Sequence, residues 1–415
     1  MKPIPYGRQN ITDEDIQAVV ETLKSDYLTQ GPKVKEFEDA FAAYIGCKYA
    51  VAVSNGTAAL HISVLTMHLK PGDKVITTPI TFVASANCVR FCGGEVVFAD
   101  IVPQTYLLDI KSVRKLLESA PKGTYKGIIP VDFAGRAVNI EEYRQLADEY
   151  DLWIIEDACH APGGYFMDSR EEKQFCGNGN YADLAIFSFH PVKHITAGEG
   201  GMITTNDEEL YKKLLILRTH GISKDASLFQ NTSETALGIQ QTTDNTRSSN
   251  DAMTNDAPNA NDFPSWYYEM QQLGFNYRLT DFQAALGNEQ LKRADEGLTR
   301  RREIAQTYDE AFKEKSFVKG QSGVVDGHAY HLYVIEVDNR KELYEHLRAN
   351  NIFAQIHYVP VHLMPYYKQF GWKSGDFLVA EQYYSQCISL PMYPTLTNEE
   401  QKFVITCINN FYNNK

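Results

Sequence analysis

The sequence lacks long apolar runs and an excess of positive charge. No apolar stretch reaches the roughly 20 residues that a membrane-spanning helix needs. Lys plus Arg number 40 against 53 Asp plus Glu, giving a formal net charge of −13 over 415 residues. Such an acidic chain is a poor general binder of nucleic acid or anionic membrane, although a local pocket can still take a small anion. The opening sequence MKPIPYGRQNITDED has no apolar segment, so we expect no secretory signal peptide.

Paired cysteines are also missing. Seven cysteines are scattered from Cys47 to Cys407 without paired spacing, which predicts free thiols in a reducing compartment and a cytoplasmic protein. Cys88 and Cys92 lie four residues apart on a predicted helix, and core packing is the favoured interpretation over a metal site. His328 and His331 have no acidic or cysteine companions at ligand spacing, so we predict no metal site.

Several common catalytic motifs are absent. The sequence contains no GxxxxGK[ST], HExxH or GxSxG. Residues 177–182 match the dinucleotide pattern GxGxxA, but they precede a predicted strand, whereas that pattern functions only between a strand and a following helix. These motifs therefore give no support for a nucleotide-binding protein, a zinc protease or a serine hydrolase.

What the chain does have is a large apolar content in an alternating pattern. Apolar residues make up 43 % and aromatic residues 12 %, enough for a sizeable core. Short β-branched runs alternate with helical patterns, which predicts βαβ units in a mostly parallel sheet. The predicted strands are Tyr49–Val53, Lys74–Thr78, Glu95–Ala99, Gly127–Val131, Leu152–Glu156 and Leu184–Phe189, with helices Thr57–Leu69, Ala84–Phe91, Ile110–Ser119 and Ile140–Tyr150 between them. Gly201–Thr205 follows without a helix and should be antiparallel.

The second half has a different organisation. Lys224–Pro264 is rich in Asn, Thr, Ser and Asp without an apolar period, and we interpret it as a long, mobile surface loop. Helical patterns then run from Thr280 to about Lys315. A smaller α+β region follows, with strands His331–Val337 and Ile352–His357, helix Arg340–Asn350 and a final helix opened by the capping box Thr397…Glu400. We predict a large α/β domain over residues 1–280, carrying the loop insertion 224–264, and a small C-terminal α+β domain over 281–415.

Two neighbouring strand ends carry the chemistry. Leu152–Glu156 runs into Asp157, and Leu184–Phe189 runs into Lys193, which a glycine-rich turn follows. Ligands of parallel sheets lie at the carboxyl ends of strands. A lysine there, with an acid on the adjacent strand, suits a bond to pyridoxal phosphate and a carboxylate on its pyridine nitrogen. A surface lysine and an unrelated strand-end aspartate remain the alternative on these residues alone.

A third strand end predicts an anion site. Ser54-Asn55-Gly56-Thr57 follows the strand Tyr49–Val53 and opens a helix, whose free N–H groups attract phosphate. Phe82, beyond the next strand end, can lie against a cofactor ring or belong to the core.

These residues belong to longer strings that resemble one family. YLTQGPKVKEFE, SNGTAAL, VITTPITFVASAN, IIEDACHA, FSFHPVKHITAGEGGMITTN, LGFNYRLTDFQAALG and SLPMYPTL occur in order from about Pro3 to Leu396. They resemble the nucleotide-sugar aminotransferases of the DegT type, which are pyridoxal-phosphate enzymes of fold type I with a mixed, mostly parallel seven-stranded sheet. Within that family, VDFAG, EDACHAPGGYF and CGNGNYADLAIFSFHPVK most resemble the transaminases that make UDP-4-amino-4,6-dideoxy-N-acetyl-β-L-altrosamine, a precursor of pseudaminic acid.

The resemblance implies roles around the cofactor ring. Lys193 would form the Schiff base, Asp157 would bind the pyridine nitrogen, and His160 would contact the 3-hydroxyl. Cys159 and Phe82 would lie against opposite ring faces. Cys159 departs from the family, where a small Ala or Ser is common.

It also implies roles further out. Gly56, Thr57 and Ser188 would hold the phosphate of the cofactor. Asn276, in GFNYR, would reach that phosphate from the second subunit of a homodimer with cross-subunit active sites. The motifs that line the sugar-nucleotide pocket contain Tyr6, Thr29, His357 and Tyr358.

The implied reaction moves an amino group from L-glutamate to the 4-keto carbon of a UDP-linked 4-keto-6-deoxy-N-acetylhexosamine. Three alternatives stay open: the same chemistry on another 3- or 4-keto UDP-, dTDP- or GDP-sugar, a sugar dehydratase, and a non-enzymatic regulator that binds pyridoxal phosphate. Dehydratases of this family typically replace the lysine with histidine, whereas Lys193 is present here. A regulator would normally carry a basic DNA-binding module, which the acidic chain lacks.

Overall fold

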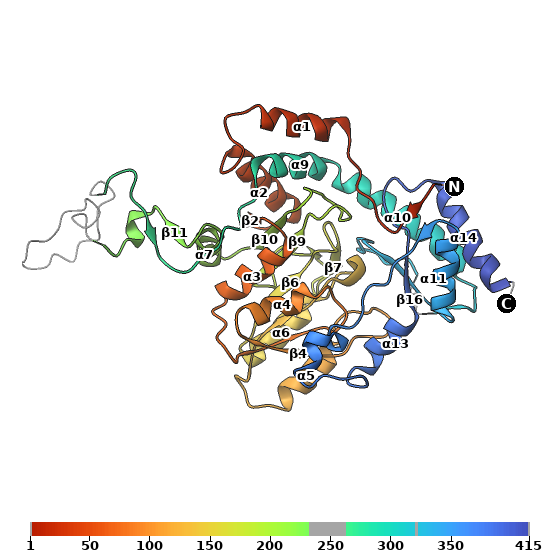
Figure 1. The fold of residues 1–415 in the computed structure, drawn as a ribbon. Coiled ribbons are helices and arrows are strands. Elements are labelled where there is room, and N and C mark those ends of the chain that lie inside the picture. Colours follow the sequence, from red (N-terminus) through yellow and green to blue (C-terminus); the bar gives the residue numbers. More distant parts are fainter. Residues whose placement is uncertain (1, 232–262, 320–322, 414–415) are drawn as a thin grey trace, which may run out of the picture.

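The computed structural model describes residues 2–231, 263–319 and 323–413 (Figure 1). Most of the predicted loop 224–264 therefore lies outside the described residues. The first half contains β1 (Ile4–Pro5), α1 (Asp13–Leu23), α2 (Pro32–Ile45), β2 (Tyr49–Val53), α3 (Gly56–Thr66), β3 (Lys74–Thr77), α4 (Ala84–Phe91), β4 (Glu95–Phe98), α5 (Ile110–Glu118), β5 (Tyr125–Ile129), α6 (Ile140–Tyr150), β6 (Trp153–Asp157), β7 (Tyr165–Met167), β8 (Lys173–Phe175), β9 (Leu184–Ser188) and β10 (Gly201–Thr205).

The second half is mostly helical and ends in a smaller sheet. It contains α7 (Glu208–Arg218), β11 (Ile222–Ser223), β12 (Glu269–Met270), α9 (Asp281–Lys292), α10 (Ala294–Phe312), β13 (Val318–Lys319), β14 (Tyr333–Val337), α11 (Arg340–Ala349), β15 (Ile352–Phe353), α12 (Pro365–Lys368), α13 (Leu378–Gln386), β16 (Cys387–Leu390) and α14 (Asn398–Asn413). The predicted capping box starts α14, because Glu400 N–H donates to Thr397 Oγ1 and Thr397 N–H donates to Glu400.

The central sheet has seven strands in the order β2-β10-β9-β6-β5-β3-β4. The strand β10 runs antiparallel to both of its neighbours, and the other pairings are parallel. The predicted fold type and the antiparallel member are thus confirmed. Because β6 and β9 are direct neighbours, the residues that follow them lie at one edge of the sheet.

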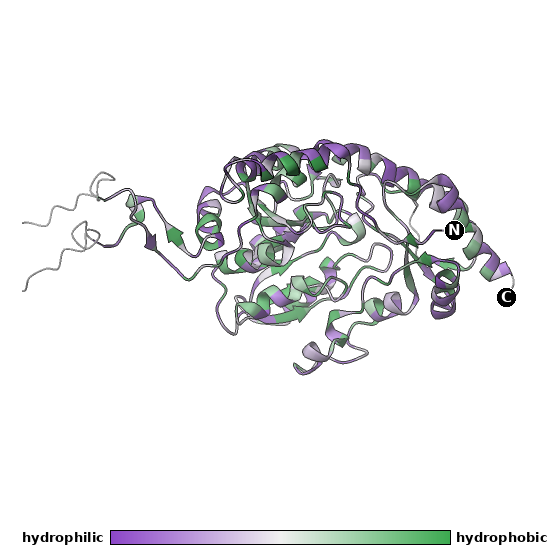
Figure 2. Ribbon diagram, turned by 45° about the horizontal axis from the view of Figure 1, so that its top comes forward, coloured by the Kyte–Doolittle hydropathy of each residue, from purple (hydrophilic) through white to green (hydrophobic). Residues whose placement is uncertain are grey.

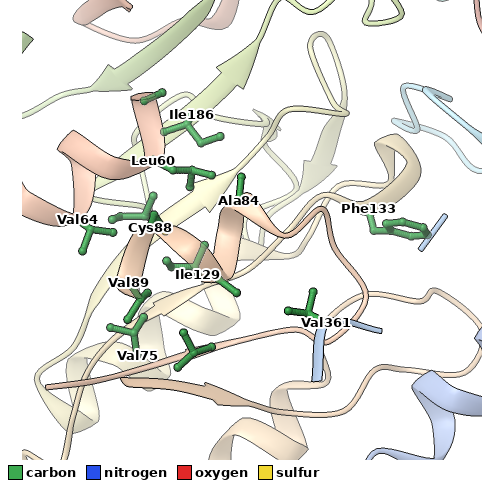
Figure 3. Packing of buried hydrophobic residues seen from close by; sticks show 14 of the residues in the cluster. Leu60, Val64, Val75, Ala84, Cys88, Val89, Ile129, Phe133, Ile186 and Val361 are labelled. Carbon is green, nitrogen blue, oxygen red and sulfur yellow. The ribbon is translucent and has the colours of Figure 1, made fainter. Parts of the chain in front are cut away.

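Helices cover both faces of this sheet. Successive strand residues point to opposite faces, and Ile129, Ile155 and Ile186 pack in a core with α3 and α4, whereas Ile128 and Ile154 pack in a different core with α5 and α6. Figure 3 shows the first of these cores, where side chains from α3 and α4 meet strand residues: Leu60, Val64, Val75, Cys88, Val89, Ile129 and Ile186 are labelled there. This three-layer packing fixes the strand ends rigidly.

A second core lies beyond the sheet, at the end of the molecule where both chain ends are found (Figure 1). It is built around the antiparallel sheet β13-β14-β16, and it also includes Ile4. The predicted strand Ile352–His357 was wrong in extent, since only β15 is extended and it pairs in parallel with β1. Beyond β15, Gln355 forms a single antiparallel bridge with Ser389, and His357 lines the cavity described below.

The helix α9 begins the predicted small domain but packs on α1 and α2 beside the large sheet. Its Ala284 and Leu291 share a core with Phe37 and Phe41 of α2. The second core first takes residues of α10 at Ile304. A division at residue 280 therefore separates α9 from the core on which it packs.

The pairing of β11 with β12 forms an arm that projects from the body near α7 (Figure 1). We use "the arm" for the described residues 222–231 and 263–273. Phe229 of the arm packs against Phe263 and Tyr267. Hydrophobic and hydrophilic residues are mixed along this projection (Figure 2).

Two further predictions concern thiols and membranes. All seven cysteines are free, as predicted. Among the described residues, no helix combines the length and the apolar character that crossing a bilayer requires.

Candidate active site

A cavity of about 680 Å³ opens at the carboxyl ends of β2, β6 and β9. Its size suits a cofactor together with part of a substrate. Its lining includes most of the site residues predicted from the sequence: Tyr6, Gly56, Thr57, Phe82, Asp157, Cys159, His160, Ser188, Lys193, His357 and Tyr358.

Asp157 is the last residue of β6, and it pairs with Ile186 of the neighbouring β9. Its side chain is 5 % exposed. Ser85 Oγ donates to Asp157 Oδ2 at 2.6 Å, and Cys159 N–H donates to Asp157 Oδ1 at 3.2 Å. The structure therefore supplies a carboxyl group that two hydrogen bonds fix on the cavity wall.

Lys193 follows β9 and lines the same cavity. A turn in which Lys193 N–H donates to His190 O at 2.8 Å carries it back toward β6. Burial lowers the pKa of the Lys193 ammonium, and nearby Cys159 and Asp157 partly oppose that effect. A lysine with a lowered pKa has a larger share of the neutral amine, which is the nucleophilic form.

The third wall is the N-terminus of α3. Asn55 caps this helix by accepting from Ala58 N–H at 2.8 Å, while the N–H groups of Gly56 and Thr57 have no partner inside the helix. A Cβ on Gly56 would lie only 3.1 Å from Ser188 Cβ, so the glycine leaves a hollow between the helix end and β9. Such a hollow, lined by N–H and hydroxyl groups, suits a phosphate.

His160 lies beside Lys193 in its neutral form. Burial, with Lys193 as a further cause, holds the pKa of His160 well below its ordinary range. Ala134 N–H donates to His160 Nδ1 at 3.3 Å, so the ring proton belongs on Nε2, which lies 3.3 Å from Tyr358 Oη. The ring of His331 lies 4.3 Å from the ring of His160. This fixed tautomer presents an N–H donor to the cavity.

The remaining cavity residues come from the segments that follow β1, β3 and β15. Tyr6 lies 5.1 Å from His357, ring to ring, and Phe82 lies 6.2 Å from Tyr358. His357 Nδ1 contacts Ser389 Oγ at 2.9 Å, and burial lowers the pKa of His357 to about 3. Phe82 is 57 % exposed, which leaves its ring open to a ligand.

Two predicted site residues lie outside this cavity. Thr29 is exposed and forms a bridge to Thr280. Asn276 is exposed and forms a bridge to Thr219, although the next residue, Tyr277, lines the cavity. One chain therefore does not bring either residue to Lys193.

Sequence reasoning missed several cavity residues. Ser85 contacts Asp157, Thr81 Oγ1 lies 2.8 Å from Ser85 Oγ, and His331 and Glu199 also line the cavity. The contact between Ser85 and Asp157 joins residues 72 positions apart. No local pattern in the sequence reveals such a pairing, although the polar Ser85 at the start of a helix was a weak signal.

Comparison with known proteins identifies a family for this chain. The sequence matches the DegT/DnrJ/EryC1/StrS aminotransferase family over residues 9–409. The chain belongs to this family. It is thus an aminotransferase, as the resemblance predicted.

Individual members of the family are similar over nearly their whole length. The spore coat polysaccharide biosynthesis protein SpsC of Bacillus subtilis is 38 % identical, over 98 % of this chain and 96 % of that protein. A UDP-4-amino-4,6-dideoxy-N-acetyl-beta-L-altrosamine transaminase of Campylobacter jejuni is 33 % identical, over 97 % and 95 %. The structure of Helicobacter pylori PseC, an aminotransferase involved in pseudaminic acid biosynthesis, aligns with a TM-score of 0.82 and 28 % identity over the full length of both chains.

Pyridoxal phosphate is the cofactor of this family, and the site fits it. Streptococcus pneumoniae Spr1654, at 27 % identity over 98 % of both chains and a TM-score of 0.80, is known in its PLP form. In the present chain, Lys193 would provide the amine and Asp157 the carboxyl group. The hollow at Gly56, beside Ser188 and the helix N-terminus, would take the phosphate. When bound, pyridoxal phosphate supplies an electron sink that stabilises negative charge at the carbon that loses a proton.

The residues of this chain have separable tasks in that chemistry. The Asp157 carboxylate would hold a proton on a ring nitrogen placed against it, because opposite charges favour the protonated state. The Lys193 amine, whose pKa is lowered by burial, would accept and return a proton in the cavity. His160 Nε2–H and Tyr358 Oη can orient an oxygen atom beside them. Together these groups provide binding, orientation and proton transfer within one rigid wall.

Proposed function

We propose that this aminotransferase moves an amino group from L-glutamate to the 4-keto carbon of a UDP-linked 4-keto-6-deoxy-N-acetylhexosamine, in a pathway of the pseudaminic acid type. The observation that carries the proposal is the convergence of Lys193, Asp157 and the α3 N-terminus in one cavity. The similarity to the Campylobacter jejuni transaminase supports the choice of sugar. Free thiols in all seven cysteines suit a cytoplasmic enzyme.

A second candidate is the same transfer to another 3- or 4-keto sugar nucleotide carried by UDP, dTDP or GDP. SpsC, which is named for spore coat polysaccharide biosynthesis, is 38 % identical, compared with 33 % for the transaminase. Because the identity to SpsC is the higher of the two, other keto sugar nucleotides must be tested as substrates.

A substrate panel decides between these candidates. The purified protein would be incubated with L-glutamate and a set of keto sugar nucleotides that vary the nucleotide, the position of the keto group and the N-acetyl group. Mass spectrometry and NMR would identify each amino sugar. The proposal expects the highest kcat/KM on the UDP-linked 4-keto N-acetyl sugar, and a dTDP- or GDP-sugar preferred by tenfold or more would contradict it. Lys193→Ala, assayed in parallel, controls for contaminating enzymes.

We further propose that the working unit is a homodimer with active sites shared between subunits. Thr29 and Asn276, the two predicted site residues outside the cavity, both lie in exposed apolar segments. Tyr27 and Leu28 precede Thr29, and Leu273, which precedes Asn276, is 76 % exposed. Large exposed apolar patches mark interaction surfaces, and burial against a second copy would bring these residues to the cavity of the partner.

A further inference from the structure

A buried acidic cluster lies directly behind the cavity wall. One potential ligand atom from each of Asp132, Glu156 and Cys176 lies within 4.8 Å of the others, and all three residues are buried. Asp132 follows β5, Glu156 precedes Asp157 on β6, and Cys176 follows β8. No residue of the aminotransferase site described above belongs to this cluster.

Each carboxyl group uses one oxygen on the backbone. Val138 N–H donates to Asp132 Oδ1 at 2.8 Å, and Gly177 N–H donates to Glu156 Oε2 at 3.1 Å. The other oxygens, Asp132 Oδ2 and Glu156 Oε1, are buried and accept no hydrogen bond from the residues that the structure describes. Two buried carboxylates this close together repel each other unless a cation or a proton lies between them.

We propose that Asp132 and Glu156 share a single proton at neutral pH, and that this acid pair is the positioning element that holds His160 and His331 at the cavity. Two buried, unpartnered carboxyl oxygens in one cluster need a donor, and a carboxylic acid O–H provides one without any further group. The inference concerns the aminotransferase machinery and does not depend on which sugar is the substrate.

The titration behaviour of the surrounding groups agrees with this arrangement. Burial raises the pKa of Asp132 to about 7 and that of Glu156 well above its ordinary range, with the partner carboxyl as a further cause for Glu156. Cys176 is also raised in pKa, mainly by burial, and stays a thiol. Asp157 is the other charged group that faces the pair, and its negative charge favours retention of the proton.

The pair acts on the cavity through one tight turn. The bond from Val138 N–H to Asp132 Oδ1 closes residues 132–138, inside which Ala134 has the unfavourable φ of +61°. The same turn supplies the Ala134 N–H that fixes His160 Nδ1. A Cβ on Gly135 would lie 2.8 Å from His160 O and 2.9 Å from His331 N, so the turn packs directly on both histidine backbones.

Amide substitutions test the shared proton because an amide N–H₂ can replace the O–H. In Glu156→Gln, the new N–H₂ would donate to Asp132 Oδ2 while the amide oxygen accepts from Gly177 N–H. Asp132→Asn preserves the reciprocal arrangement. We expect each single variant to melt within a few degrees of the parent, and the double variant to melt several degrees below the sum of the single effects, because two N–H₂ groups then face each other.

A large gain in stability in the single variants would overturn the proposal. If both carboxylates were ionised without a shared proton, each single amide would relieve their repulsion, and both single variants would melt well above the parent. A stoichiometric metal ion in the purified protein, lost in both single variants, would replace the proton with a cation and also contradict the inference. These melts use the protein without added substrate, so they do not depend on the proposed sugar.

Proton linkage and activity provide independent readouts. A folded-state pKa raised above the unfolded value gives stability that is present at low pH and is lost as pH rises. Relative to Glu156→Gln, the parent protein should lose stability between pH 5 and 8 with a slope of about one proton.

Asp132→Ala should lower kcat at least tenfold, and Asp132→Asn should restore it. Equal kcat in the alanine variant and the parent would show that the turn does not position His160.

Discussion

The cavity wall and the arm differ in burial and in the kind of side chain that they present. The wall is buried and polar, and its groups are held by contacts such as Ser85 to Asp157 and Ala134 to His160, which join distant parts of the chain. The arm is exposed and aromatic, with Trp266 64 % exposed and Leu273 76 % exposed. The contacts of one chain hold Asp157 and His160 in place, whereas the apolar surface of the arm is still uncovered.

The difference explains where the predicted site residues lie. Lys193 and Asp157 follow neighbouring strands of the main sheet, so sheet formation alone brings them to one edge. Asn276 follows the arm and stays exposed in a single chain. A site residue carried by an apolar, projecting segment is the arrangement expected for a second subunit.

The largest effect is expected at the centre of the wall. Lys193→Ala should abolish covalent attachment of pyridoxal phosphate and reduce turnover by about 10⁴-fold, because the variant lacks both the nucleophile and the proton carrier. Borohydride trapping followed by peptide mass spectrometry measures the attachment. Lys212→Ala, at an exposed lysine of α7, is the matched control and should change neither quantity. Turnover near the parent value in Lys193→Ala would refute the role given to the wall.

The next effect concerns the charge on the same wall. Asp157→Asn should slow the half-reaction with L-glutamate by about 10²- to 10⁴-fold, since the neutral amide no longer favours a protonated ring nitrogen. Stopped-flow absorbance of the bound cofactor measures this half-reaction. Ser85→Ala removes one donor to the same carboxylate and should have a smaller effect. An unchanged rate in Asp157→Asn would leave that residue a packing role only.

Mixing two inactive variants tests whether the arm completes the wall of a partner. Asn276→Asp should cripple a site by placing a negative charge beside the cofactor phosphate. In a heterodimer with Lys193→Ala, shared sites would place both lesions in one site and leave the other intact. Tandem-tag purification should then recover about half of the parent activity per dimer. An inactive heterodimer would show that each chain builds its own site.

A smaller effect comes from the buried histidines around the wall. Burial lowers the pKa of His328 and His357 to about 3, and holds that of His194 well below its ordinary value. A depressed folded-state pKa gives stability that is present above about pH 6.5 and is lost as pH falls toward 3. Each such histidine should reduce the free energy of unfolding by about 1.4 kcal/mol per pH unit below 6.5.

Urea unfolding at pH 7.5, 6.5 and 5.5 measures this dependence. In His346→Gln, at a partly exposed histidine of α11, the slope with pH should match that of the parent. A free energy of unfolding that stays constant over this range would contradict neutral burial of the cluster.

The smallest effect on Tm is expected from replacing the segment that connects the two strands of the arm. Residues 233–261 are polar and lack an apolar period, so replacing them with a short Gly/Ser linker should leave Tm within about 2 °C of the parent. Phe229→Ala, which removes a packed ring from the outer part of the arm, should lower Tm more than that replacement does. A large fall in Tm on replacement would mean that the segment docks on the protein or on a second copy.

The sequence was sufficient for features set by local pattern. The strands β2 and β10 and the helices α4 and α6 have the predicted bounds, because each combines a clear period with a defined end. The edge that holds Asp157 and Lys193 followed from strand order alone. The strand predicted over 352–357 was too long, since only Ile352 and Phe353 pair with β1, and Gln355 forms a single bridge to a different segment at Ser389.

Contacts between distant segments could not be predicted from the sequence. The strand β16, the hairpin of β7 with β8, and the bond between Ser85 and Asp157 depend on partners that no local period identifies. The pair Asp132 and Glu156 appeared as two ordinary acids in strand-end motifs. Only the packing of β5 beside β6 shows that their carboxyl groups share one buried space.

The pairing of β1 with β15 has a consequence for the order of folding during synthesis. The second core includes Ile4 from the start of the chain and Ile352 from near its end. Strands β2 to β10 emerge from the ribosome early and can form the main sheet while synthesis continues. Ile4 and Pro5 must wait for their partner strand until β15 has been made, after all the strands of the main sheet. Closing so long a loop is slow, so the ribosome-bound chain carries an unpaired N-terminal strand that chaperones can bind.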